Sequence, residues 1–159
     1  MFTDDVDRTD FCRRLIRCVR RAEWGIRAFC LMRTHYHLLV EVEENELQPG
    51  MQWLNGTYAQ QFNRRHGRWG HLGGCRYSAA SVDSERHLFR CFRYIARNPV
   101  EAELCAAPQD WPWSSYRGLA GYAKGFPFVD DRAIHALFGR EPTATGLLRA
   151  FVEEALTEP

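Results

Sequence analysis

The sequence has a single lysine, no long apolar run and no paired cysteines. These absences exclude some classes of protein. No apolar run approaches the roughly 18 residues that a membrane-spanning helix needs. The acidic start Met1–Asp5 lacks the apolar segment of a signal peptide. None of the six cysteines forms a CxxC pair, which argues against a disulfide framework or a zinc site. We therefore expect a cytoplasmic protein without membrane contact, whose cysteines are small buried side chains.

Acidic residues are missing from the centre of the chain, although the net charge of the whole is only +1. No aspartate or glutamate occurs between Glu46 and Asp83, and residues 51–98 carry eight arginines against two acids. Lys124 is the only lysine, so the basic charge is almost all arginine, which forms planar, bidentate contacts with phosphate. A GC-rich genome would also produce an arginine bias, but it would not remove the acids. The net charge of the whole chain is near zero, but its central stretch is basic and therefore compatible with binding to nucleic acid.

Hydrophobic periodicity predicts an α+β chain in the order helix, strand, strand, helix, strand, helix. The expected elements are a helix over 8–24, strands over 26–32 and 35–42, a helix over 51–65, a strand over 76–82 and a helix from 84 to about 97. Asn98-Pro99 is expected to end the last helix. Two further helical patches lie near 131–138 and 144–157. This order resembles a ferredoxin-like antiparallel sheet with helices on one face, from which the first strand is missing.

The sharpest chemical feature is His35-Tyr36-His37 in the second predicted strand. Alternate residues of a strand project to the same face, so the two imidazoles would form a pair suited to a metal ion. Two ordinary surface or core histidines would give the same pattern. The last predicted helix places Tyr94 and Asn98 one turn apart, where tyrosine can act as a covalent nucleophile and the amide oxygen can bind a metal. A half-buried tyrosine and an asparagine before proline would also account for these two residues.

Four segments together resemble the REP-associated tyrosine transposases, which belong to the HUH (His-hydrophobic-His) superfamily of single-stranded DNA transposases. The segments are 31–40 (LMRTHYHLLV), 51–72 (MQWLNGTYAQQFNRRHGRWGHL), 93–100 (RYIARNPV) and 110–117 (DWPWSSYR). Their order along the chain is specific, although the histidine motif alone is weak. The resemblance implies a ferredoxin-like HUH domain over 1–107, truncated at its N-terminus. It also implies a C-terminal extension over 108–159 that holds the PWSSYR element and helices.

The resemblance implies an enzyme that cleaves and rejoins single-stranded DNA at hairpin (REP-type) sites. Tyr94 matches the nucleophile that forms a 5′-phosphotyrosine intermediate. His35 and His37 match the motif histidines, and Asn98 matches the third contact of a divalent metal, Mg²⁺ or Mn²⁺. We expect six arginines in matched or neighbouring segments to contact DNA: Arg64, Arg65, Arg68, Arg76, Arg90 and Arg97. The oligomeric state is open between a monomer and a homodimer.

Two departures from the family pattern affect the predicted sheet. Family chains begin with a strand ahead of the segment that matches Asp4–Leu15, whereas Met1 falls at that segment here. The absent strand would leave unpaired backbone groups beside the two-histidine strand. An upstream start, a decayed copy, or another segment or subunit that fills the gap would each account for it. In addition, Ser78–Ser81 (SAAS) stands where β-branched strand residues are expected.

Three hypotheses about function remain. The first is the metal-dependent tyrosine transposase. The second is a catalytically inactive, truncated relic that still binds DNA, which the missing strand favours and the intact motif residues oppose. The third is an unrelated α+β metal hydrolase, whose activity would survive Tyr94→Phe. Tyr58, Phe62 and Trp69 are candidates for stacking on bases, although Phe62 fits the core better.

Overall fold

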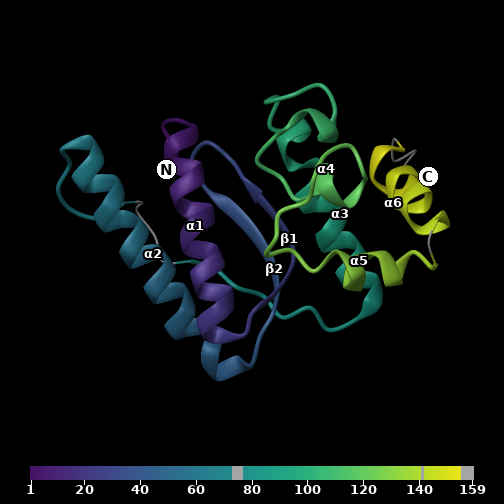
Figure 1. Ribbon diagram of the computed structural model, residues 1–159, viewed down its shortest axis with the longest axis horizontal. Coiled ribbons are helices and arrows are strands. Elements are labelled where there is room, and N and C mark those ends of the chain that lie inside the picture. The colour runs from purple at the N-terminus through teal and green to yellow at the C-terminus, as the bar shows by residue number, and fades with distance from the viewer. Residues whose placement is uncertain (73–76, 141, 155–159) are drawn as a thin grey trace.

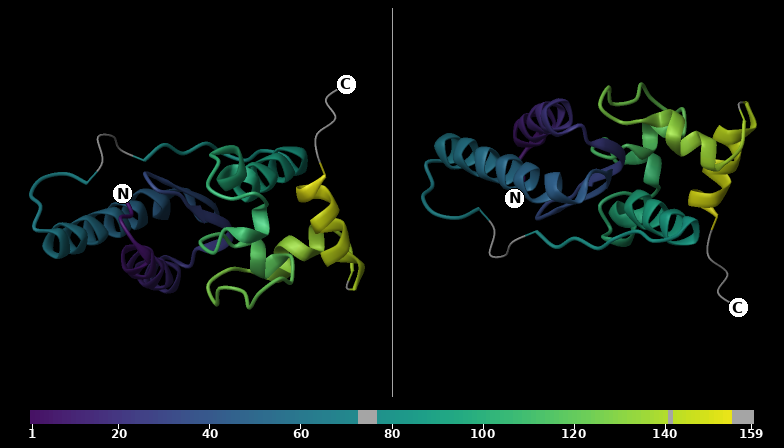
Figure 2. Two further views of the ribbon diagram at one scale, coloured as in Figure 1. Left: turned by 90° about the horizontal axis from the view of Figure 1, so that it is seen from above. Right: turned by 90° about the horizontal axis from the view of Figure 1, so that it is seen from below.

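A two-stranded antiparallel hairpin lies at the centre of the computed structural model, between two groups of helices (Figures 1 and 2). The structure describes residues 1–72, 77–140 and 142–154. The elements are α1 (Asp5–Ala22), β1 (Gly25–Leu31), β2 (Tyr36–Glu41), α2 (Glu44–His66), α3 (Glu85–Glu101), η1 (Pro108–Asp110), α4 (Tyr116–Leu119), α5 (Asp131–Leu137) and α6 (Thr143–Glu153). The predicted α+β class with a helical extension is confirmed. Within the described ranges, no helix has the length and apolarity needed to cross a membrane.

Helices cover both faces of the hairpin because β1 is apolar on both of its faces. Ala28 and Cys30 contribute to a core with α3 and the C-terminal helices, whereas Phe29 and Leu31 contribute to a core with α1 and α2. All four side chains are buried. A sheet face that is apolar must be covered by another layer, so this strand requires helices on each side. The structure thus corrects the expectation that helices lie on one face only.

Asp7 links α1 to α2 on the face of the hairpin that these two helices cover. Its side chain is only 2% exposed, forms an ion pair with Arg65, and lies 3.0 Å from His66 Nε2. The backbone N–H of Thr3 donates a further hydrogen bond to it. Burial raises the pKa of the Asp7 carboxyl, but the hydrogen bonds from these three residues lower it by more, so its pKa lies below the ordinary value.

The outer edges of the two strands have different neighbours. The outer edge of β1 is covered by the C-terminal extension, because the Leu31 N–H donates to the Trp113 carbonyl (2.8 Å) and the Ser115 N–H donates to the Phe29 carbonyl (3.0 Å). In the part of the chain that the structure describes, the sheet contains no strand beyond β2. Among the described residues, the strand that carries His37 therefore has β1 as a neighbour on one side and no strand on its outer side.

One predicted strand and two predicted helix ends are wrong. Residues 77–82 are exposed and form no regular structure, while residue 76 lies outside the described residues. The small side chains of Ser78–Ser81 cannot bury the apolar surface that stabilises a strand. α2 begins at Glu44, ahead of the predicted residue 51, because Glu44 and Glu46 interact favourably with the positive end of the helix dipole. α3 continues past Pro99, since so close to the C-terminus a proline removes only one helical hydrogen bond.

Candidate active site

The hairpin turn brings the two histidines of the HxH motif together. The Met32 N–H donates to the His35 carbonyl (2.9 Å), which closes a two-residue turn and fixes where β2 begins. The Nε2 atoms of His35 and His37 lie 3.0 Å apart, so one imidazole donates to the other. Thr34 Oγ1 lies 3.1 Å from His35 Nδ1 and helps to orient that ring. Strand alternation therefore produces the predicted pair of imidazoles on one face.

α3 places Tyr94 and Asn98 against this pair. The Tyr94 ring meets the His37 ring nearly edge-on, with 5.3 Å between their centroids, and Tyr94 is 51% exposed. Asn98 is 8% exposed, and its side chain forms a hydrogen bond with His37. Thus the structure brings together all four residues that the sequence singled out for chemistry. The nucleophile candidate faces solvent, whereas the amide lies in the interior behind it.

The position of Tyr94 follows from the amphipathic pattern of α3. The helix begins at a capped N-terminus, where the Ser84 hydroxyl accepts a hydrogen bond from the His87 N–H. Phe92, Ile95 and Ala96 are buried in the core that includes β1. With this stripe against the hairpin, residues on its flank lie beside β2. Packing of α3 therefore sets the distance between the tyrosine and the histidines.

The electrostatic environment keeps the His37 imidazole neutral near pH 7. Burial lowers the pKa of His37, and the neighbouring His35 lowers it further, while the hydrogen bond with Asn98 raises it. The net effect is a His37 pKa below its ordinary value. A neutral imidazole retains a nitrogen lone pair, which is the form that binds a metal ion.

The donor set is compatible with a divalent metal ion. Two ligands that bind one ion at right angles, each about 2.1 Å away, are about 3.0 Å apart. The two Nε2 atoms have this separation, and the Asn98 amide could add an oxygen. In the described ranges, no group of three or more His, Cys, Asp or Glu residues could hold a metal ion. A metal here would thus depend on the histidines, Asn98 and ligands from outside the chain.

Three of the six arginines expected to contact DNA point into solvent. Arg64 and Arg68 lie at the C-terminal end of α2 and just beyond it, and Arg90 lies on α3. Across the described parts of the chain, none of the three has an acidic partner within ion-pair distance. Each is therefore available to an external anion.

The other three arginines have different surroundings. Arg65 forms ion pairs with Asp4 and Asp7, which fixes it between α1 and α2. Arg97 donates to the Val152 carbonyl of α6 (2.9 Å). Arg76 lies outside the described residues. Arg65 and Arg97 therefore already have partners within the protein.

Two polar residues near the site have roles that sequence reasoning did not assign. Thr34 contacts His35, and its position next to the HxH motif is the signal that could have indicated this contact. His87, about two helical turns before Tyr94 on α3, lies 3.2 Å from Asp83 at the start of the helix. His87 is therefore part of the helix N-terminus and not of the imidazole pair.

A family model for "Transposase IS200 like" matches residues 1–98, which run from the N-terminus through Asn98. The chain belongs to the family of IS200-like transposases. This result confirms the transposase family predicted from the four segments. The match contains both histidines and Tyr94, so the IS200-like segment of this transposase ends at the last residue of the candidate site. No curated protein and no solved structure shows significant similarity to the chain.

Proposed function

We propose that this transposase cleaves and rejoins single-stranded DNA at hairpin, REP-type sites through a 5′-phosphotyrosine on Tyr94. The proposal depends on one observation above all: the solvent-exposed ring of Tyr94 lies edge-on against His37, one member of an imidazole pair. The family supports DNA transposition in general terms. The hairpin and REP specificity comes from the resemblance of the four sequence segments.

In the cleavage step, Tyr94 Oη loses its proton to solvent and forms a bond to the scissile phosphorus. The bond between phosphorus and O3′ breaks, and the released oxygen takes up a proton to become a 3′-OH. Rejoining reverses this exchange, because a 3′-OH attacks the phosphotyrosine and the tyrosine oxygen leaves. The number of phosphate ester bonds is unchanged, so neither step needs an external energy source. The exposure of Tyr94 allows a DNA strand to reach its hydroxyl.

His35, His37 and Asn98 would hold a divalent cation beside Tyr94. When bound, Mg²⁺ or Mn²⁺ supplies a Lewis acid for the phosphate oxygens. The protein's own contribution is positional, because α3 and the hairpin turn fix the imidazoles and Tyr94 relative to each other.

The decisive experiment looks for a denaturant-resistant protein–DNA adduct after incubation of a hairpin oligonucleotide with Mn²⁺. We expect wild type to form the adduct and Tyr94→Phe to lose it while keeping the thermal unfolding midpoint of wild type. Tyr77→Phe is the matched control, because Tyr77 is also an exposed tyrosine (37%) and its adduct should persist. An adduct with Tyr94→Phe would refute the assignment, as would the lack of any adduct with hairpins from the source genome.

A second candidate function is a DNA-binding relic without catalysis. The observation that favours it is the open outer edge of β2, because the strand that holds His37 lacks a neighbour there in the described residues. An edge strand is less constrained than a central one, and metal ligands need fixed positions. Hairpin binding without any adduct, under conditions where Mn²⁺ is present, would support the relic.

A further inference from the structure

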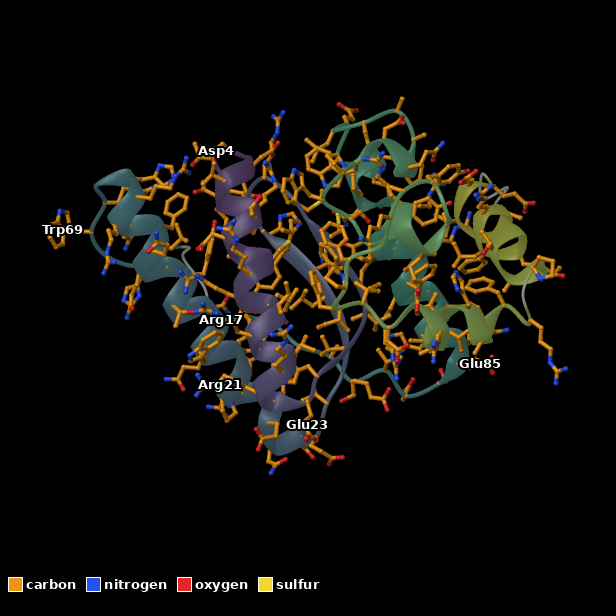
Figure 3. The ribbon with its side chains drawn as sticks, in the orientation of Figure 1. Asp4, Arg17, Arg21, Glu23, Trp69 and Glu85 are labelled. Carbon is orange, nitrogen blue, oxygen red and sulfur yellow. The ribbon has the colours of Figure 1, made fainter. Side chains whose placement is uncertain are left out.

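Trp69 is far more exposed to solvent than the other four tryptophans of the chain. It is 97% exposed, whereas Trp24 is 2% exposed and the other three are partly buried. Figure 3 shows its indole pointing away from the molecule at the end of α2. Tryptophan is mostly buried in folded proteins, and an indole left in water is a common mark of a binding site.

The segment that carries Trp69 is folded back on α2. α2 ends at His66 and is capped by Gly67, whose φ of 60° is left-handed and suits glycine. The Arg68 N–H donates to the Asn63 carbonyl (2.9 Å), and the Asn63 amide donates to the Gly70 carbonyl (2.7 Å). Trp69 thus lies between two residues that are each bonded to the same asparagine. The indole is held outward by this turn, which reduces the entropy lost when a ligand binds.

The surroundings of the indole are cationic. Arg68 directly precedes Trp69 and Arg64 lies in the last turn of α2; both are exposed and have no acidic partner among the described residues. The sequence contains no acid between Glu46 and Asp83, so no nearby carboxylate along the chain opposes them. An aromatic face with flanking arginines fits a ligand that combines a flat π-system with negative charge, which is the chemistry of a nucleotide in a DNA strand.

We infer that Trp69 stacks on an unpaired base of the DNA, with Arg64 and Arg68 on the neighbouring phosphates. The inference rests on the proposed function for the identity of the polymer. A base inside a duplex has both faces covered by its neighbours, whereas a base in a hairpin loop or single-stranded flank can offer a free face. Trp69 would therefore distinguish a hairpin with unpaired bases from plain duplex, at a point just beyond the C-terminus of α2 that is separate from the α3 residues that would react.

The test compares the binding of two DNAs of equal length and charge by fluorescence anisotropy at one salt concentration. One is a hairpin with an unpaired loop and flank, and the other is a blunt duplex. Loss of one stacked base corresponds to about a 5- to 150-fold weaker affinity, so Trp69→Ala should lose this much for the hairpin and little for the duplex. Trp69→Phe keeps a ring and should retain most of the affinity. Leu147→Ala, at an exposed apolar residue of α6 (50%), is the matched control and should bind as wild type.

Unchanged hairpin affinity of Trp69→Ala would overturn the stacking site, and so would equal losses for hairpin and duplex. The adduct assay separates this result from the catalytic proposal. Hairpin binding that depends on Trp69 without any Tyr94 adduct would support the stacking site and refute the chemistry. An adduct that forms while Trp69→Ala binds normally would do the reverse. Absence of wild-type binding to either DNA would overturn the stacking site as well.

Discussion

Substitutions at two glycines of α2 test how this helix packs against Trp24 at the start of the hairpin. Gly50 and Gly56 both lie inside α2, and each would gain helix propensity on substitution by alanine. That gain is about 1 kcal/mol, because glycine loses more backbone entropy on folding than alanine does. The substitutions Gly50→Ala and Gly56→Ala are chemically identical, so any difference between them reports the tertiary environment.

The structure predicts opposite outcomes for the two substitutions. A Cβ at Gly56 would meet nothing within 4 Å, so Gly56→Ala should stabilise the protein by about 1 kcal/mol. A Cβ at Gly50 would lie 2.4 Å from Cζ2 and 2.9 Å from Cε2 of Trp24, whose side chain is buried. A rigid indole must then move by about 1 Å to reach a normal contact distance. Such overpacking costs about 3 kcal/mol, so Gly50→Ala should destabilise by about 2 kcal/mol after the propensity gain.

Urea denaturation followed by circular dichroism measures both changes directly. The two variants should differ by about 3 kcal/mol in free energy of unfolding, with unchanged dependence on urea concentration. Equal stabilities, or a Gly50→Ala variant more stable than wild type, would refute the contact between α2 and Trp24. That outcome would also alter the positions of Arg64, which lies on α2, and of Arg68 and Trp69, which follow shortly after it.

Three further predictions concern single side chains. Asp7→Asn should lower the free energy of unfolding by about 1–3 kcal/mol at pH 7. Because the folded pKa of Asp7 is lowered, its contribution is present above about pH 4 and disappears as pH falls below that, so urea titrations at pH 3 should show a smaller difference. Ser115→Ala should cost about 1–3 kcal/mol and speed hydrogen exchange of the Phe29 amide, which donates to the buried Ser115 hydroxyl (3.0 Å). EDTA should abolish the Tyr94 adduct, and Mn²⁺ should restore it in wild type but not in His37→Ala.

The parts of the site that could be predicted from sequence are those set by local geometry. Alternation along a strand placed His35 and His37 on one face, and one helical turn aligned Tyr94 with Asn98. The meeting of these two pairs is a contact between residues far apart in the chain. Periodicity carries no information on such contacts, so only the family resemblance predicted it.

The parts that could not be predicted depend on tertiary partners. Arg65 and Arg64 are adjacent in the sequence, yet Arg65 is paired with Asp7 while Arg64 faces solvent. Likewise, nothing in the segment Trp113–Ser115 marks it as the cover of the β1 edge. Its backbone pairs with β1 without forming a regular strand, so a periodicity search does not detect it.

The distinction between free and engaged arginines can be measured as a salt dependence. Each phosphate neutralised on a single strand contributes about −0.7 to the slope of log affinity against log salt concentration. If the exposed Arg64, Arg68 and Arg90 make the contacts, the slope should be about −2, whereas all six predicted arginines would give about −4. Arg65→Ala should then leave the slope unchanged, while Arg68→Ala should reduce its magnitude by about 0.7. A slope near −4 that Arg65→Ala reduces would show that DNA displaces Asp4 and Asp7 from Arg65, and the basic surface would have to be redrawn between α1 and α2.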